Sequence, residues 1–266
     1  MATHKTADGT RLFYRVRGKG GPTIVFIHGW CSRQTHWDAQ MRYFARRHRV
    51  LAVDRRGHGR SDSPTQGYSA KQHAADLREI LRKERIRNAV LVGHAGGVPA
   101  TLELTVADPT RVKALVLIDS RIHPAAHLDD PDDPAGAAFR SMIDGIRGPQ
   151  GARYFKRMYS DLFSRHAGEI GRQAIREALE TPREIAADEL SSITIDSLSL
   201  AKKVRQPVLW LTAGGEDEAG IASGFRNVQF GQVVGSGHFP QLEVPDQTNA
   251  MIARFIATLG TPRSRK

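Results

Sequence analysis

The sequence predicts an α/β protein with a mostly parallel sheet, helices on both faces and one helical insertion. Short apolar runs rich in β-formers alternate with helix-length amphipathic segments, which is typical of βα units. This alternation stops after Asp119 and resumes near residue 200. A chain of 266 residues is long for one domain and short for two. We therefore expect one core domain, residues 1–120 and 200–266, with a helical cap over 121–199.

The strands are expected where the apolar runs lie. Parallel strands covered on both faces have nearly continuous apolar sequences. The expected strands are 23–28, 49–54, 89–93, 114–119, 207–213 and 228–234. Residues 11–18, "RLFYRVRG", are expected to form an antiparallel edge strand of a hairpin.

The helices are expected between these runs, where apolar residues recur with helical spacing. These segments are 37–47, 69–86, 97–109 and 244–260. Pro99 falls in the first turn of its helix, where the missing N–H costs nothing. Residues 121–199 open with a turn-rich stretch and then have helical patterning without a strand signal.

Composition and charge exclude several classes of function. The formal charge of +11 comes from Lys and Arg scattered along the chain, without a recognisable nucleic-acid-binding module or a set of aromatics for base stacking. No apolar run approaches the ~18–20 residues of a membrane span, and the polar N-terminus does not resemble a signal peptide. The single cysteine, Cys31, suits a reducing compartment. We expect a cytoplasmic protein that acts on a small molecule, without a metal or cofactor.

Two motifs follow the first two central strands. "HGW", residues 28–30, places the backbone N–H of Trp30 above the carboxyl edge of the sheet, where such a group can stabilise an oxyanion. "DRRGHGRS", residues 54–61, contains glycines for a tight path, and Asp54 and Arg56 can lock the loop through charge-assisted hydrogen bonds. We expect this second loop to shape the site without taking part in chemistry.

The third motif, "GHAGG" at residues 93–97, has the pattern of a nucleophile elbow, the sharp strand-to-helix turn that presents a nucleophile. Its glycines allow a cramped turn, and Gly96 supplies a second N–H at a helix N-terminus. The central position of such an elbow is normally serine. Here it is Ala95, which has no hydroxyl.

The fourth motif, "GSGHFPQLEVPDQ" at residues 235–247, follows the last strand. It places His238 where a general base could reach an elbow residue. His94, next to Ala95, is expected to pack or hydrogen-bond within the elbow, or, with Trp30, to line the substrate site.

These four motifs, in this order and spacing, resemble the α/β-hydrolase superfamily over roughly residues 10–120 and 200–260. The resemblance implies a twisted, mostly parallel sheet of eight strands, a cap, and a triad of nucleophile, acid and histidine. The nucleophile position falls on Ala95, the base on His238, and the oxyanion hole on Trp30 and Gly96. No cofactor is implied.

Two carboxylates compete for the acid position. The family usually places the acid after the strand "PVLWLTA", which favours Asp217 in "GGED". Some branches use the end of the preceding strand instead, which here is Asp119. Either carboxylate would orient His238 and stabilise its charged form.

Three hypotheses account for Ala95. In the first, the chain is a hydrolase of small carboxylic esters whose serine is replaced by alanine, so that it traps substrate. In the second, the chain uses His238 as a base without a covalent intermediate. "HGWC" and Asp119 resemble the cofactor-independent dioxygenases of this fold, which open the ring of hydroxyquinolones. In the third, it is a pseudoenzyme that only binds a ligand. We favour the first.

Overall fold

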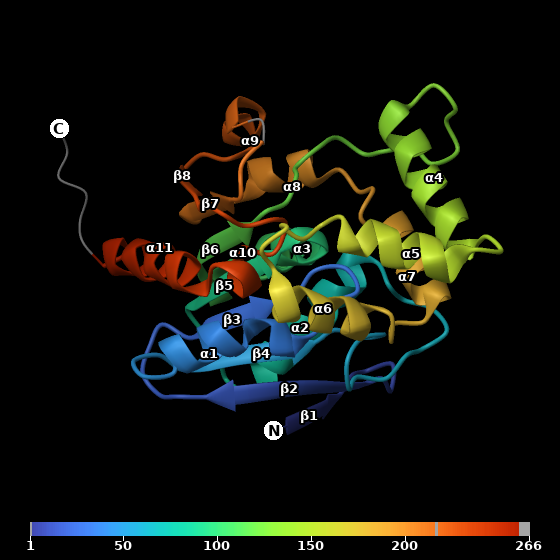
Figure 1. Cartoon of the computed structure of the whole chain (residues 1–266). Coiled ribbons are helices and arrows are strands. Elements are labelled where there is room, and N and C mark those ends of the chain that lie inside the picture. The colour runs from blue at the N-terminus through green and yellow to red at the C-terminus, as the bar shows by residue number, and fades with distance from the viewer. Residues whose placement is uncertain (1, 216–217, 261–266) are drawn as a thin grey trace.

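The computed structural model describes residues 2–215 and 218–260, whose eight strands form one twisted sheet (Figure 1). The strand order is β1-β2-β4-β3-β5-β6-β7-β8. β2 is antiparallel to both neighbours, and the strands from β4 to β8 in this order are parallel. The predicted fold class is confirmed. The strands are β1 (Ala2–Lys5), β2 (Arg11–Arg17), β3 (Ile24–Ile27), β4 (Val50–Asp54), β5 (Ala89–His94), β6 (Val112–Ile118), β7 (Val208–Thr212) and β8 (Val228–Gln232).

Helices cover both faces of this sheet (Figure 1). α2 and α3 pack on one face, α1 and α11 on the other. The helices are α1 (Asp38–Phe44), α2 (Ala70–Lys83), α3 (Val98–Ala107), α4 (Pro134–Arg147), α5 (Gly151–Ser160), α6 (Gly168–Ala178), α7 (Arg183–Ser192), α8 (Ser197–Lys203), α9 (Glu218–Gly224), α10 (Pro240–Glu243) and α11 (Pro245–Thr258). Short 3-10 turns are η1 (Gln34–Trp37), η2 (Ala95–Gly97) and η3 (Pro109–Arg111).

The apolar runs that predicted the strands form the core. Every residue of β3, β4 and β5 is buried, as expected for parallel strands with helices on both faces. In these strands alternate side chains belong to opposite clusters: Val25 and Ile27 pack towards α2 and α3, and Ile24 and Phe26 towards α1 and α11. Because β3, β5 and β6 are neighbouring parallel strands, their carboxyl ends come together at one edge of the sheet.

The structure differs from the predicted elements at several places. β2 is an internal strand, because the polar residues of β1 pair with it and form the edge. α8 begins before the predicted boundary at residue 200 and packs against α3, so it joins the core. α9, between β7 and β8, was not predicted.

We call the whole segment between β6 and α8 the insertion. It contains helices α4–α7 and the loops between them. It extends beyond the carboxyl edge of the sheet (Figure 1). Phe155 and Tyr159 of the insertion share an apolar cluster with Cys31 and Phe239 of the sheet loops. No helix in the described part of the chain is long and apolar enough to cross a membrane.

Candidate active site

The site begins at the turn from β5 into α3. Ala95 is the first residue of η2 and has a φ of +46°, a left-handed conformation that non-glycine residues adopt at an energetic cost. Gly97 is required on steric grounds, because a Cβ there would lie 2.5 Å from the carbonyl oxygen of His28. The turn is therefore tightly constrained by the β3 loop, and it holds Ala95 in the strained geometry of an elbow. Ala95 is partly exposed to solvent.

The two expected oxyanion donors lie side by side. A Cβ built on Gly96 would be 3.1 Å from the backbone nitrogen of Trp30, and one built on Gly29 would be 3.2 Å from the Cβ of Ala95. The loop after β3 therefore runs against the elbow at residues 95 and 96. Trp30 and Gly96, like Ala95, are partly exposed to solvent.

His238 and Asp119 form a close pair at the same edge. Nδ1 of His238 lies 2.7 Å from Oδ2 of Asp119, whose Oδ1 accepts a hydrogen bond of 2.8 Å from the Ala213 N–H. Burial acts to raise the pKa of Asp119, but the hydrogen bond and charge of His238 outweigh it, and the pKa lies below the usual value. An ionised Asp119 keeps the proton of a neutral His238 on Nδ1, which leaves Nε2 free to act as a base. The His238 side chain is 28% exposed.

The structure describes only one of the two candidate acids. Asp217, the acid favoured from the sequence, lies outside the described residues. Asp119, the alternative, holds His238 directly. The backbone after β7 contributes one hydrogen bond to this pair, from the Ala213 N–H to Asp119.

His94 is buried beneath the histidine loop. Its Nε2 lies 2.7 Å from the carbonyl oxygen of His238. Burial, together with the charge of His238, lowers the pKa of His94 to about 3, so its imidazole is neutral and donates its Nε2–H to that carbonyl. The ring is 1% exposed, so it acts in elbow packing and in holding the loop of His238, and we do not propose that it contacts substrate.

The loop after β4 is locked by charges, although Asp54 and Arg56 do not bind each other. Asp54 accepts the backbone N–H groups of Gln34 and Arg60, at 2.7 and 3.1 Å. Arg56 makes a two-pronged pair with Asp76 of α2, with both N–O distances 2.7 Å. The loop is thus tied to η1 and to α2.

The insertion contacts both halves of the site, which the sequence did not predict. The Trp30 indole Nε1–H donates to the Ala186 carbonyl of α7 at 2.8 Å. The His238 N–H donates to the Leu162 carbonyl at 2.7 Å, and the rings of Phe163 and Phe239 stack at 4.4 Å. These partners are separated by more than 70 residues in the chain, so no local pattern could have revealed them.

A buried charge cluster was also missed. Arg55 pairs with Glu189 of α7, and both side chains are 2% exposed. In a sequence, a single glutamate in an amphipathic helix is normally solvated, so Glu189 gives no signal. The described residues contain no group of three or more His, Cys, Asp or Glu side chains that could hold a metal.

Comparison with known proteins identifies the family. Residues 24–251 match the alpha/beta hydrolase family. The chain belongs to this family. Similar curated members include a non-heme chloroperoxidase of Streptomyces lividans, 41% identical over 45% of this chain and 45% of that protein. A bifunctional esterase/perhydrolase of Acinetobacter calcoaceticus is 40% identical over 35% of this chain and 34% of that protein. The matched segments thus span about half or less of these relatives.

Solved structures share the fold over nearly the whole chain. An esterase from Thermogutta terrifontis superposes with a TM-score of 0.85 and 22% identity, covering 98% of this chain and 99% of its own. An enol-lactonase from Burkholderia xenovorans gives 0.83 and 19% identity, covering 96% and 100%. At these identities the likeness concerns the fold.

Proposed function

We propose that this site is built to hydrolyse small carboxylic esters and that Ala95 occupies the position of its serine nucleophile. The observation that carries the proposal is the His238–Asp119 pair at the edge of the sheet that also carries the strained elbow. A φ of +46° has no functional use for an alanine side chain. For a nucleophile it has one, because this conformation presents the side chain at the carboxyl edge of the sheet.

With a serine at position 95, the residues would divide the work as follows. His238 Nε2 would take the hydroxyl proton as the oxygen attacks the ester carbonyl, and Asp119 would stabilise the resulting imidazolium. The N–H groups of Trp30 and Gly96 would bind the carbonyl oxygen as it becomes negative. The imidazolium would protonate the departing alcohol, and water activated by His238 would release the acid.

In the chain with Ala95, the covalent step is absent while the oxyanion donors and the base remain. Loss of a serine nucleophile alone costs on the order of 10⁶ in turnover in a well-studied serine protease. We infer that this chain binds an ester with little turnover. Ester chemistry is supported by the relatives, since the Acinetobacter protein is described as an esterase/perhydrolase.

The test compares the chain with its Ala95→Ser variant on p-nitrophenyl acetate and butyrate. We expect the serine variant to raise kcat by several orders of magnitude, and a further His238→Ala change to abolish the gain. The matched control is Ser120→Ala in the same background, because the Ser120 hydroxyl donates a hydrogen bond of 3.1 Å to the Ala95 carbonyl oxygen and is thus a second hydroxyl beside the elbow. This variant should keep the gain in kcat. Equal activity of the alanine and serine chains would contradict the proposal.

A second candidate is chemistry in which His238 is the base and position 95 needs no nucleophile. It is favoured by one observation, that Ala95 has no hydroxyl while His238 is still paired with Asp119. His238 would then remove a proton from an acidic hydroxyl, as in a hydroxyquinolone, and the anion would react with dioxygen. Oxygen uptake by the unaltered chain with 3-hydroxy-4-quinolone, lost in His238→Ala, would support this candidate over the first.

A further inference from the structure

The buried charge cluster beneath α7 contacts the peptide group that carries the first oxyanion donor. Arg55 follows β4 and extends two nitrogens in different directions. Nη1 pairs with Glu189, and Nη2 donates to the carbonyl oxygen of Gly29 at 2.8 Å. The Gly29 carbonyl belongs to the same peptide unit as the Trp30 N–H. Arg55 therefore links an insertion helix to the backbone of the expected oxyanion hole.

The direction of the Trp30 N–H follows from this bond. The only cis peptide in the described chain is at Gly21–Pro22, so the Gly29–Trp30 peptide is trans. In a planar trans peptide the C=O and N–H bonds point in opposite directions. Holding the carbonyl towards Arg55 therefore turns the Trp30 N–H away from Arg55. Gly96 packs against the same nitrogen, since a Cβ built on Gly96 would lie 3.1 Å from it.

His28 holds the same carbonyl from a second side. Its Nε2 accepts the Arg55 backbone N–H at 2.9 Å, so its proton is on Nδ1, which lies 2.9 Å from the Gly29 oxygen. Burial, and then the charge of Arg55, lower the pKa of His28, which keeps it in this neutral form. Two donors, one of them charged, polarise the peptide and strengthen its N–H as a donor.

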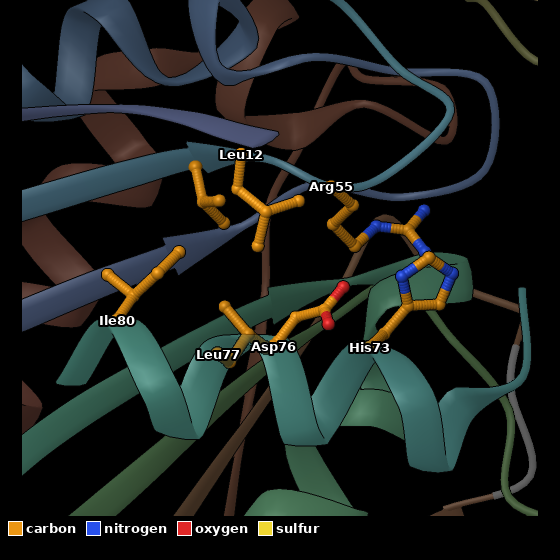
Figure 2. A pocket seen from close by; sticks show the side chains of 7 residues that line it. Leu12, Arg55, His73, Asp76, Leu77 and Ile80 are labelled. Atoms are coloured by element: carbon orange, nitrogen blue, oxygen red, sulfur yellow. The ribbon is translucent and has the colours of Figure 1, made fainter. Parts of the chain in front are cut away.

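The insertion fixes Arg55 in turn. Glu189 lies 3.1 Å from His58 Nε2 and 3.0 Å from His73 Nε2, in addition to its pair with Arg55. Burial raises the pKa of Glu189, but Arg55 and the histidines hold it well below its usual value, so the carboxylate is charged. Figure 2 shows the side chain of Arg55, which follows β4, facing that of His73 on α2. Removing one partner from a buried charge cluster leaves the other charges uncompensated and is strongly destabilising.

We propose that Arg55 is a positioning residue of the oxyanion hole, which orients and polarises the Trp30 N–H through the Gly29 carbonyl, and that Glu189 of the insertion keeps Arg55 in place. The oxyanion hole is then complete only while α7 is seated. The expected effect of Arg55 on kcat rests on the proposed function, whereas its effect on the orientation of the Trp30 N–H does not. The simpler account is a charge cluster that only fastens α7 to the core.

The first test is NMR of the unaltered chain labelled with ¹⁵N-tryptophan, which contains three tryptophans. The Trp30 backbone amide reports the oxyanion peptide, and its indole N–H reports the seat of α7 through Ala186. Arg55→Lys keeps the charge beside Glu189 but offers one nitrogen for two partners. We expect the Trp30 amide signal to move, while the Trp30 indole and the Trp37 and Trp210 signals stay. An unmoved amide, or an amide and indole that move together, would overturn the proposal.

The second test is kinetic and uses the Ala95→Ser background. Arg55→Lys should lower kcat roughly tenfold or more with KM unchanged, because the donor acts on the transition state. Arg147→Met is the matched control. Arg147 of α4 pairs with Asp188, which lies next to Glu189 on α7 but on its exposed side, so this variant should leave kcat and KM unchanged. A KM effect without loss of kcat would overturn the proposal. If Ala95→Ser is inactive, the proposed function fails and the NMR result alone decides the role of Arg55.

Loss of folding would not leave the question open. If Arg55→Lys does not fold, the pair Arg55→Met/Glu189→Gln removes both buried charges together, which is usually tolerated better than removal of one. The same two readouts apply to this pair, with the same expected shift of the Trp30 amide.

Discussion

His238 Nδ1 and Asp119 Oδ2 lie 2.7 Å apart, although the residues are 119 positions apart in the chain. Asp119 follows β6 and His238 follows β8, and the two strands are separated in the sheet by β7. Because parallel strands end at a common edge, a carboxylate and an imidazole from different βα units can meet there. With Asp119 ionised, the pairing places the proton of a neutral His238 on Nδ1, and in the proposed function Nε2 then faces the substrate.

The first prediction separates the two acids. In the Ala95→Ser background, Asp119→Asn should lower kcat by roughly 10⁴, because an amide cannot hold the correct tautomer or stabilise the imidazolium. Asp217→Asn is the matched control and should leave kcat unchanged. The measurement is steady-state hydrolysis of p-nitrophenyl butyrate, and the reverse pattern would assign the acid to Asp217.

The second prediction concerns strain at the elbow. Ala95→Gly should leave the free energy of unfolding unchanged or raise it by up to about 1 kcal/mol, because relief of the left-handed conformation offsets the added chain entropy. Gly97→Ala should lower it by roughly 1–3 kcal/mol, since its Cβ would overlap the His28 carbonyl. Urea unfolding of both variants checks this contrast. Marked destabilisation by Ala95→Gly would mean that the turn is unstrained.

The third prediction is acid sensitivity through buried neutral histidines. Burial lowers the pKa of His73 to about 4 and that of His94 to about 3, against about 6.5 in the unfolded chain. Between these values the unfolded chain binds more protons, so the free energy of unfolding falls as the pH falls. From pH 7 to pH 5 the loss should be on the order of 2 kcal/mol per imidazole.

Urea unfolding of the chain at pH 7, 6 and 5 measures this loss. His73→Gln should reduce the pH dependence of the free energy of unfolding by the contribution of one imidazole. His166→Gln, at an exposed position, should leave this pH dependence unchanged. An equal slope in all three proteins would contradict the assignment of a neutral His73.

The fourth prediction concerns the contact between the insertion and the histidine loop. Glu243 accepts the N–H of Ser164 at 3.1 Å and the N–H of Gly237 at 3.0 Å, so its carboxylate joins the two segments. Glu243→Ala should increase amide hydrogen exchange in residues 160–166 and 235–239. Asp246→Ala, an exposed acid on the next helix, is the control. Unchanged exchange in both segments would show that the contact is not held by Glu243.

Much of the fold could be predicted because each central strand is a continuous apolar run. β1 could not, since the sequence of Ala2–Lys5 has no apolar pattern and pairs only by backbone bonds with β2. In the site, the elbow, His238 and the loop of Trp30 follow from local motifs. The choice between Asp119 and Asp217 does not, because both follow neighbouring strands of the sheet. Arg55 and Glu189 were missed because buried charges resemble surface charges in a sequence.

The most direct test of the central claim is intact-mass spectrometry of the Ala95→Ser variant after reaction with a fluorophosphonate. We predict one covalent adduct, mapped by peptide analysis to position 95, with no adduct on the unaltered chain and greatly slowed labelling in the Ala95→Ser/His238→Ala variant. Absence of an adduct on folded Ala95→Ser, or labelling of another serine at equal rate in the unaltered chain, would contradict the assignment of position 95 as the nucleophile position.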